Sequence, residues 1–440
     1  MIADLKPYAD YTDAGPSWLG KVPAHWQIVR SKRLFTARQE LARPDDVQLS
    51  ATQAYGVIAQ SLYEERTGYR VVKISVHLDK RRHVERDDFI ISMRSFQGGL
   101  ERAWSTGAIR SSYVVLKPDP QIDAAYFRYL FKSAPYIAAL RATGDFIRDG
   151  QDTPRAEQAA IGRFLDWALG RLERTIRAKR KVIALLTEQR RAVIRRAVTR
   201  GLDPAVQLKP TGIPWLGEIP KHWELSRVKN EFRCLNTRRT PLNSVERGRM
   251  KVRAFDYYGA SGVIDKEGDY LFDDELLLIA EDGANLVLRN LPLAIVAKGK
   301  FWVNNHAHIL KPTRGNIVYM AHVLESLNFR PWISGAAQPK LTQNRLMAIL
   351  IAVAPPAEQD AIVLHADRLS QPLTATISRL EREIELLREY RTRLVADVVT
   401  GKLDVREAAA RLPDKAEPET GGEAEDENEE AELTDEAAEA

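Results

Sequence analysis

An internal repeat of almost half the chain constrains the fold more than any other feature. Residues 18–26 read WLGKVPAHW and residues 215–223 read WLGEIPKHW, so six of nine positions are identical at an offset of 197. A second match starts at the Ala-Glu-Gln triplets of residues 156–158 and 357–359 and continues at a constant offset of 201 as far as Thr199 and Thr400. The order A, B, A′, B′ is typical of a duplicated pair of domains, because each unit is too long for a solenoid repeat.

Each B segment carries a heptad stripe, which predicts a long helix. The two stripes, each with eight apolar positions of ten, are Leu165, Leu169, Leu172, Ile176, Lys179, Ile183, Leu186, Arg190, Val193 and Ala197, and Ala366, Ser370, Leu373, Ile377, Leu380, Ile384, Leu387, Arg391, Leu394 and Val398. The shared arginine position either fixes the register or lies at an exposed end of the seam. Matching stripes related by duplication predict antiparallel packing of the two helices. The alternative is that each stripe packs on its own globular domain.

Proline and glycine positions predict the helix boundaries. We expect the first helix over about residues 171–199, and the second to begin at Pro372 with Ser370 or Gln371 near its N-cap. Both should end near Gly201 and Gly401, because glycine is common just after a helix. A helix of about 29 residues would be roughly 44 Å long.

The A segments combine strand and helix patterns over about 150 residues each, enough for an independent core. Strands are predicted at residues 71–76, 89–93, 113–116, 276–280, 293–297 and 348–353, and helices at residues 126–131 and 318–327. The predicted fold class is therefore α+β, with two duplicated α/β domains joined by two long antiparallel coiled-coil helices in a pseudo-two-fold arrangement.

Charge is distributed unevenly along the chain. The chain has 65 basic and 60 acidic residues, but residues 414–440 hold 13 of the acidic residues and one lysine. Subtraction leaves residues 1–413 with 64 basic and 47 acidic residues, a net charge of +17. This favours a polyanionic partner for the folded part. The acidic tail is expected to be disordered and to serve solubility, or to compete weakly with nucleic acid.

Several classes of enzyme and metal site lack their motifs in this sequence. There is no GxxxxGK[ST] loop, and the one Pro-Pro pair does not belong to a methyltransferase tetrapeptide. Asp45 and Asp46 lack the Glu-x-Lys of a metal nuclease and are interpreted as a solvated turn. His306 and His308 lack further ligands and are interpreted as packing or hydrogen-bonding residues. The lone Cys234, the missing signal peptide and the missing run of about 20 apolar residues predict a cytoplasmic protein without a membrane partner.

Taken together, the motifs resemble the specificity subunit of Type I restriction-modification systems. The resemblance covers residues 8 to about 412 and rests on the two repeats, on SMRSFQGG at residues 92–99, on AAQPKL at residues 336–341 and on TGKLD at residues 400–404. It divides the chain into a target-recognition domain at residues 1–152, a helical spacer at 153–203, a second recognition domain at 204–356, a second spacer at 357–404 and an acidic tail at 405–440.

The resemblance implies a non-catalytic DNA-binding subunit that reads a bipartite site on double-stranded DNA. It further implies two modification subunits docked on the helices, which use S-adenosylmethionine to methylate adenine. Restriction and translocase subunits would use ATP and Mg²⁺, and this chain itself would bind no cofactor. A 44 Å helix corresponds to about 13 base pairs, so recognition domains at its two ends could face the same side of a duplex.

Polar residues after predicted strands are the candidates for base reading, since Arg pairs with guanine and Asn or Gln with adenine. The candidates are Arg94, Ser95, Gln97, Arg148 and Gln151 in the first domain and Asp282, Asn285, Asn304, Asn305, Gln338 and Lys340 in the second. Trp26 and Trp223 are interpreted as core residues, and His25 and His222 as local hydrogen-bonding partners.

The first domain departs from this pattern just before its helix. Gln338 lies 20 positions before Glu358, but Gln151, taken as its counterpart, lies 6 positions before Glu157. About 14 residues, including the strand expected at 348–353, are therefore predicted to be missing from the first domain. The alternative function is thus a scaffold or partly inactivated homologue that binds modification subunits but no longer reads both half-sites.

Overall fold

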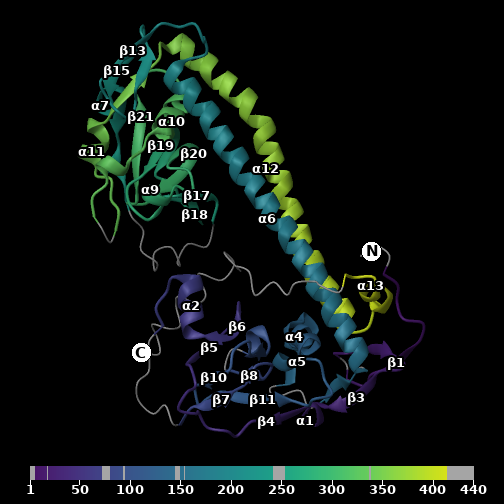
Figure 1. Cartoon of the computed structure of the whole chain (residues 1–440). Helices are drawn as coiled ribbons and strands as arrows, with labels where there is room; N and C mark the ends of the chain where they lie inside the picture. The colour runs from purple at the N-terminus through teal and green to yellow at the C-terminus, as the bar shows by residue number, and fades with distance from the viewer. Residues whose placement is uncertain are drawn as a thin grey trace. The chain divides into compact units, whose positions relative to one another are not determined.

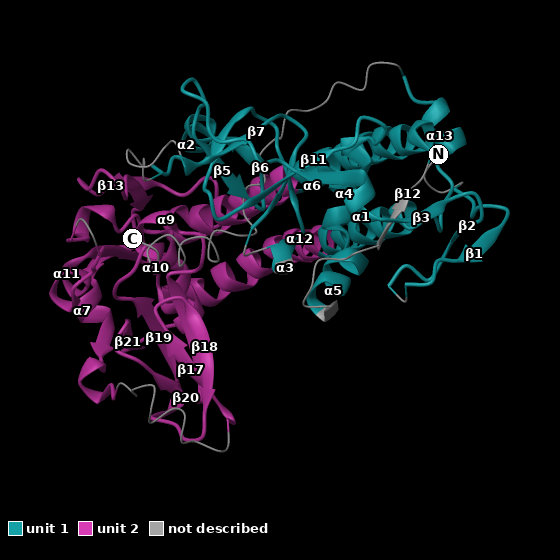
Figure 2. Ribbon diagram, turned by 90° about the horizontal axis from the view of Figure 1, so that it is seen from below, with its two compact units in different colours: residues 1–179, 382–440 teal, residues 180–381 magenta. Residues whose placement is uncertain are grey.

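The computed structural model describes residues 5–16, 18–71, 80–92, 95–143, 149–152, 154–240, 253–335 and 338–413. It divides into two compact units, residues 1–179 with 382–440, and residues 180–381 (Figure 2). Each unit contains one globular domain and part of each of two long helices, α6 (Arg155–Arg200) and α12 (Pro356–Val399) (Figure 1). We call the described parts of residues 1–152 and 204–356 the first and second globular domains.

The two long helices run antiparallel within each unit. In unit 1, Lys179 forms an ion pair with Glu383, and Arg391 lies 3.5 Å from Glu173. In unit 2, Arg190 donates a hydrogen bond to the Thr374 hydroxyl at 3.2 Å. As the residue number increases along α6, the number of its contact residue in α12 decreases. The positions of both stripes are buried or half-buried except Arg391, which is exposed. The predicted antiparallel packing is therefore confirmed.

Both long helices begin earlier than the sequence predicts. Helix α6 starts at Arg155 rather than near residue 171, and α12 starts at Pro356 and continues through Pro372. The predicted start at Pro372 is wrong because a proline inside a helix removes only one intrahelical hydrogen bond, and the turns on either side retain theirs. The predicted ends are confirmed, since Gly201 and Gly401 have φ of 73° and 76°.

The first globular domain is built from short strands and helices. Its strands are β1 (Tyr11–Asp13), β2 (Lys21–Pro23), β3 (Gln27–Arg30), β4 (Phe35–Ala37), β5 (Leu49–Thr52), β6 (Gly56–Ala59), β7 (Arg82–Val84), β8 (Phe89–Ile91), β9 (Glu101–Arg102), β10 (Gly107–Ile109), β11 (Val114–Pro118) and β12 (Asp149–Asp152). Its helices are α1 (Ser31–Leu34), α2 (Gln60–Thr67), α3 (Ser95–Gly98), α4 (Ala124–Lys132) and α5 (Ala134–Thr143). Among the described residues, the largest sheet has the order β4-β11-β8-β9.

The second globular domain has a larger sheet, ordered β16-β21-β19-β20-β17-β18 in its described part. Its strands are β13 (Leu208–Pro210), β14 (Glu218–Pro220), β15 (Glu224–Arg227), β16 (Phe232–Cys234), β17 (Phe255–Gly259), β18 (Gly262–Glu267), β19 (Phe272–Ala280), β20 (Ala294–Val303), β21 (Ala307–Pro312) and β22 (Leu350–Val353). Its helices are α7 (Val228–Glu231), η3 (Asn236–Arg238), α9 (Asn285–Leu288), α10 (Ile317–Ser326), η4 (Arg330–Trp332) and α11 (Gln343–Ala348).

Most of the predicted elements in these domains are present. The predicted strands at 89–93, 113–116, 276–280, 293–297 and 348–353 correspond to β8, β11, β19, β20 and β22, and the predicted helices to α4 and α10. The strand predicted at 71–76 lies almost wholly outside the described residues.

The strand expected to be missing from the first domain is present. Strand β12 pairs antiparallel with β3, with Asp149 opposite Arg30, just as β22 pairs with β15, with Leu350 opposite Arg227. The offset of 201 therefore extends upstream through this strand, and Gln151 corresponds to Ala352 rather than to Gln338. The two domains differ in length between the preceding helix and this strand. In the first domain, Asp149 lies 17 positions after Lys132, the last residue of α4. In the second domain, Leu350 lies 25 positions after the equivalent residue of α10, Glu325.

Residues 405–412 do not belong to the tail, contrary to the sequence prediction. They include α13 (Arg406–Ala410), and Val405, Ala408, Ala409 and Leu412 are buried. The backbone N–H of Asp404 donates to the carbonyl of Lys6 at 2.7 Å. The segment after α12 therefore packs on the first domain through apolar side chains. The predicted boundary of the tail was based on charge and did not take these side chains into account. Residues 414–440 lie outside the described residues.

Candidate nucleic-acid interface

The repeated sequence motifs attach each long helix to its own globular domain. In unit 1, the Glu157 carboxylate accepts hydrogen bonds from the Tyr8 hydroxyl at 2.6 Å and from Trp26 Nε1 at 3.0 Å, and it lies 2.8 Å from His25 Nε2. The carboxylate is buried, so these partners replace the water it loses. The next residue, Gln158, accepts a hydrogen bond from the backbone N–H of Asp123, the N-cap of α4.

Unit 2 repeats this anchor with equivalent residues. The Glu358 carboxylate accepts from Trp223 Nε1 at 3.0 Å and lies 2.8 Å from His222 Nε2. Gln359 accepts from the backbone N–H of Asn316, the N-cap of α10. The buried tryptophans and hydrogen-bonded histidines are as predicted. Since four contacts position the start of α6 and three equivalent contacts position the start of α12, the motifs fix the direction in which each helix leaves its domain.

A polar cluster lies at the strand ends of the second globular domain, and we define it as Arg239, Glu281, Asp282, Asn305, His306 and Lys340. Glu281 and Asp282 follow β19, the residues 305–306 form the turn between β20 and β21, and Arg239 follows η3. Arg239 forms an ion pair with Glu281 at 2.5 Å and donates to the carbonyl of Asn305 at 3.2 Å. Lys340 lies 3.3 Å from Glu281, and His306 Nδ1 lies 2.9 Å from Asp282.

Electrostatics hold Glu281 in its charged form. Burial would raise the pKa of this carboxyl, but the hydrogen bond from Arg239 and the neighbouring positive charges bring its pKa below the ordinary value. Behind it, His308 Nε2 lies 2.7 Å from the Leu341 carbonyl, and its Nδ1 lies 2.9 Å from the Asn236 amide nitrogen. Burial lowers the pKa of His308, which favours a neutral ring that donates through Nε2 and accepts at Nδ1.

The structure brings four of the predicted base-reading residues together in or beside this cluster: Asp282, Asn304, Asn305 and Lys340. Asn305 is exposed and the Lys340 side chain is half exposed, so both are accessible to a ligand. Asn304 is buried and accepts a hydrogen bond from the His306 backbone N–H at 2.8 Å. Asn285 instead closes its own turn through two hydrogen bonds to Leu291. Gln338 is exposed, two residues from Lys340. Base contact remains a prediction for all six candidates of this domain.

The first domain's candidates are not gathered in one comparable cluster. Ser95 is buried and accepts a hydrogen bond from the Ser92 backbone N–H, whereas Gln97 is exposed and its carbonyl accepts from Arg141. Gln151 lies in β12, opposite Ile28. Arg94 and Arg148 lie outside the described residues. Sequence reasoning paired Gln151 with Gln338 because both precede the Ala-Glu-Gln triplet, but the strand register contradicts that pairing.

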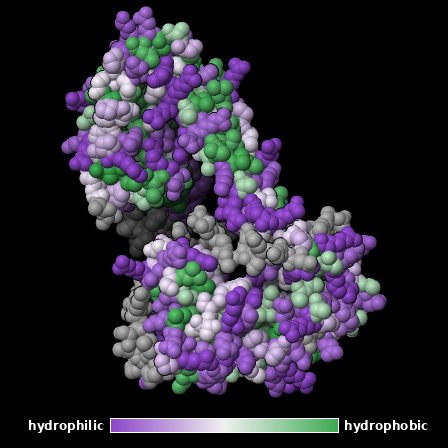
Figure 3. Space-filling view, viewed as in Figure 1, coloured by the Kyte–Doolittle hydropathy of each residue, from purple (hydrophilic) through white to green (hydrophobic). Residues whose placement is uncertain are grey.

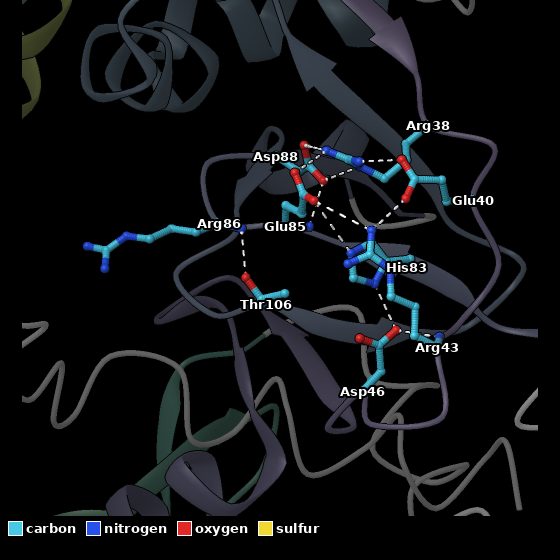
Figure 4. A network of polar contacts seen from close by, with 9 residues as sticks. All are labelled: Arg38, Glu40, Arg43, Asp46, His83, Glu85, Arg86, Asp88 and Thr106. Carbon is cyan, nitrogen blue, oxygen red and sulfur yellow. Dashed lines mark hydrogen bonds and ion pairs between the residues drawn. The ribbon is translucent and has the colours of Figure 1, made fainter.

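Sequence reasoning missed a charged network in the first domain (Figure 4). The buried Arg38 donates to Asp88 at 2.8 and 3.1 Å, to Glu40 at 2.7 Å and to Glu85 at 3.0 Å. Burial opposes the charge on Arg38, but its hydrogen bonds to Asp88 and the negative charges of the neighbouring carboxylates prevail and raise the pKa of the arginine. Such a paired network gives the β7–β8 turn a fixed shape.

The same network corrects the interpretation of Asp46. This carboxylate lies 2.8 Å from Nδ1 of His83, whose side chain is fully buried, and accepts from the Arg43 backbone N–H at 2.8 Å. Asp45 is exposed, as a solvated turn requires, but Asp46 is a structural partner of a histidine. Asp46 and His83 are 37 positions apart in the chain, so the sequence alone does not reveal this contact.

In the described ranges, no group of three or more His, Cys, Asp or Glu side chains is placed to hold a metal ion. No helix there is both long enough and apolar enough to cross a bilayer.

The fold defines a class of protein in which two duplicated α+β domains are carried on a pair of long antiparallel helices. A solved structure titled for complex assembly and conformational transition of the type I R-M system matches 87% of this chain and 99% of its own, with a TM-score of 0.53 and 13% identity. That likeness shows the shared fold. The HsdS subunit from Thermoanaerobacter tengcongensis matches 88% of this chain at 14% identity with a TM-score of 0.43.

Sequence comparison leads to the same class. The chain is 35% identical over 138 residues to the putative type I restriction enzyme specificity subunit S.HindORF215P of Haemophilus influenzae. This match spans 31% of the chain and about a third, 34%, of that relative. No family model matches the chain. The resemblance to the specificity subunits of type I restriction-modification systems is thereby confirmed, in sequence over part of the chain and in fold over most of it.

Proposed function

We propose that this chain is the DNA-specificity subunit of a type I restriction-modification complex and reads a bipartite site on double-stranded DNA. The observation that carries the proposal is the repeated helix anchor, in which Glu157 and Glu358 hold equivalent His-Trp pairs. Two similar domains, each fixed to the start of one of two paired helices, are suited to reading two separate half-sites. The net charge of +17 over residues 1–413 supports a polyanionic ligand.

Base reading in the second domain is assigned to the exposed part of its polar cluster. Asn305 and Lys340 are accessible, while Arg239 and Glu281 hold the turn that presents them. An asparagine amide suits adenine, and a lysine suits guanine or a phosphate. The remaining predicted residues complete the proposed set at lower priority, because buried side chains such as Ser95 are engaged in the fold. These residues are Arg94, Ser95, Gln97, Arg148 and Gln151 in the first domain and Asp282, Asn285, Asn304 and Gln338 in the second.

The long helices are the proposed docking surface for the modification subunits. Leu185 on α6 and Leu386 on α12, related by the offset of 201, are 67% and 64% exposed. In the space-filling view, apolar side chains stand among hydrophilic ones along the helices (Figure 3). An exposed leucine at the same position in both copies suits one modification subunit for each copy. S-adenosylmethionine would be bound by those subunits, ATP and Mg²⁺ by restriction subunits, and this chain would contribute recognition without catalysis.

The scaffold alternative loses its main support. It was based on a missing strand in the first domain, and β12 occupies that position with the same register as β22. The proposed function therefore assigns a half-site to each domain.

The test is single-molecule methylation mapping of DNA from cells that express the chain with its modification subunit. We expect a bipartite adenine motif that vanishes when this chain is deleted. The double variant Asn305→Ala, Lys340→Ala should relax one half-site by at least about tenfold and leave the other unchanged. Leu288→Ala, at an exposed position of the same domain, is the matched control. A motif that is unaltered by loss of the chain would overturn the proposal.

A further inference from the structure

His306 is an exposed residue of the second globular domain whose backbone is held on both sides. It lies in the turn between β20 and β21. Its N–H donates to the Asn304 side-chain oxygen at 2.8 Å, and its carbonyl accepts from the Glu281 N–H at 2.9 Å. Arg239 donates to the carbonyl of the preceding residue, Asn305, at 3.2 Å. The turn therefore has a fixed shape, and the imidazole ring is presented from a rigid backbone.

A carboxylate orients the ring of His306. The ring nitrogen Nδ1 lies 2.9 Å from each of the two carboxylate oxygens of Asp282. Because an ionised carboxylate can only accept hydrogen bonds, the proton between them belongs to Nδ1. The Asp282 side chain is 13% exposed, and its backbone is paired antiparallel with that of Lys340. Both members of the pair thus stand on backbone that other segments hold in place.

The second ring nitrogen, Nε2, is left for a ligand. The His306 side chain is 46% exposed, and no residue in the described part of the chain forms a hydrogen bond with Nε2. In the neutral ring with the proton on Nδ1, Nε2 is an acceptor. By contrast, His308 is buried and uses both ring nitrogens, toward Asn236 and the Leu341 carbonyl. His308 therefore serves the fold, whereas the Nε2 of His306 faces solvent without a structural partner.

The chemistry of this acceptor selects its ligand on DNA. In the major groove, the hydrogen-bond donors on the bases are the exocyclic amines of adenine and cytosine. The neighbouring Asn305 is exposed, and the half-exposed Lys340 adds a positive charge that suits a phosphate close by. An exposed ion pair contributes little to stability, so the fixed orientation of the ring is better suited to recognition than to holding the domain together.

We propose that His306 is a base-reading residue of the second domain and accepts, through Nε2, a hydrogen bond from the exocyclic amine of adenine or cytosine. Asp282 is then a positioning residue, because it keeps the proton on Nδ1 and thereby keeps Nε2 an acceptor. This role rests on the proposed function, since it requires DNA at the polar cluster.

Methylation mapping with His306→Ala locates the base pair that is read. We expect one base pair of one half-site to lose its definition, with discrimination reduced roughly tenfold, while the other positions stay defined. Asn230→Ala, at an exposed polar position of the same domain, is the control and should leave the motif unchanged. A motif that depends on the chain but is unaltered by His306→Ala would overturn the base-reading role alone. A motif that does not depend on the chain would overturn the proposed function as well.

Synthetic duplexes that carry the mapped motif test the hydrogen bond itself. At the located base pair, 2-aminopurine in place of adenine, or pyrimidin-2-one in place of cytosine, removes the major-groove amine. The complex of the chain with its modification subunit should bind the amine-free duplex about tenfold more weakly than the native duplex, and the His306→Ala complex less than about twofold more weakly. Equal losses for the two complexes would overturn the proposal.

Asp282→Asn tests the positioning role, because asparagine has nearly the same shape but no longer holds the proton on Nδ1. This variant should lose about as much discrimination at the located base pair as His306→Ala does. The double variant should lose no more than His306→Ala alone, since Asp282 acts through the ring. Losses that add in the double variant, or a uniform weakening on all sequences, would overturn the assignment, because they indicate a structural role or a phosphate contact.

Discussion

Glu157 and Glu358 occupy equivalent positions at the starts of the two long helices but differ in burial and in number of partners. The Glu157 side chain is 6% exposed and has three partners, whereas Glu358 is 27% exposed and has two. Removing a buried acceptor leaves its donors unsatisfied. We expect Glu157→Ala to lower the free energy of unfolding by about 2–4 kcal/mol and Glu358→Ala by about half as much. Equal losses in urea unfolding of the full chain would contradict this ranking.

Glu101 predicts a pH dependence that originates in one side chain. Burial raises its pKa from 4.5 to about 7 despite the ion pair with Lys132. The folded protein keeps this proton up to about pH 7 and the unfolded chain releases it near pH 4.5, so this contribution to stability is present at low pH and is lost as the pH rises through that window. We expect a loss of about 3 kcal/mol between pH 4.5 and 7.5. In Glu101→Gln, the free energy of unfolding measured with urea should depend less on pH than in the original protein. Parallel pH profiles for the two proteins would exclude Glu101 as the source of the pH dependence.

At the scale of elements, Pro372 is the one proline inside α12 and has no N–H to donate to the carbonyl of Arg368. Its side chain is exposed, so replacement changes the backbone more than the packing. We expect Pro372→Ala to stabilise the protein by about 1–3 kcal/mol, because proline is disfavoured in helix interiors. Gln371→Ala, at the exposed neighbouring position, should change the stability by less than about 0.5 kcal/mol. Thermal unfolding of the full chain measures both, and a lower melting temperature for Pro372→Ala would contradict the expectation.

The sequence predicts those elements whose own residues specify them. The helical stripes and the apolar strands β8, β19 and β22 follow from hydrophobic periodicity. Strand β12 does not, because Asp-Gly-Gln-Asp has no strand pattern and forms a strand only through pairing with β3. In the polar cluster, Asp282, Asn305 and Lys340 were predictable as polar residues near strand ends. Arg239 was not, since only the sheet brings it to Glu281, 42 positions away.

At the scale of the whole molecule, the proposed spacer between half-sites depends on the length of the paired helices. Deleting residues 187–193 from α6 and 370–376 from α12 removes one heptad from each, and the Arg190–Thr374 hydrogen bond places these segments opposite each other. The register on either side is kept, while each helix shortens by about 10 Å. At 3.4 Å per base pair, methylation mapping should find the same two half-sites with a spacer about 3 base pairs shorter. Deleting the heptad from α6 alone keeps its apolar stripe in phase but leaves α6 about 10 Å shorter than α12 and pairs its later stripe positions with different layers of α12, and it should abolish the motif. Because Leu185 and Leu386 lie outside both deletions, the proposed partner-docking surface stays intact, and an unchanged spacer in a stable complex would refute the role of the helices as a ruler.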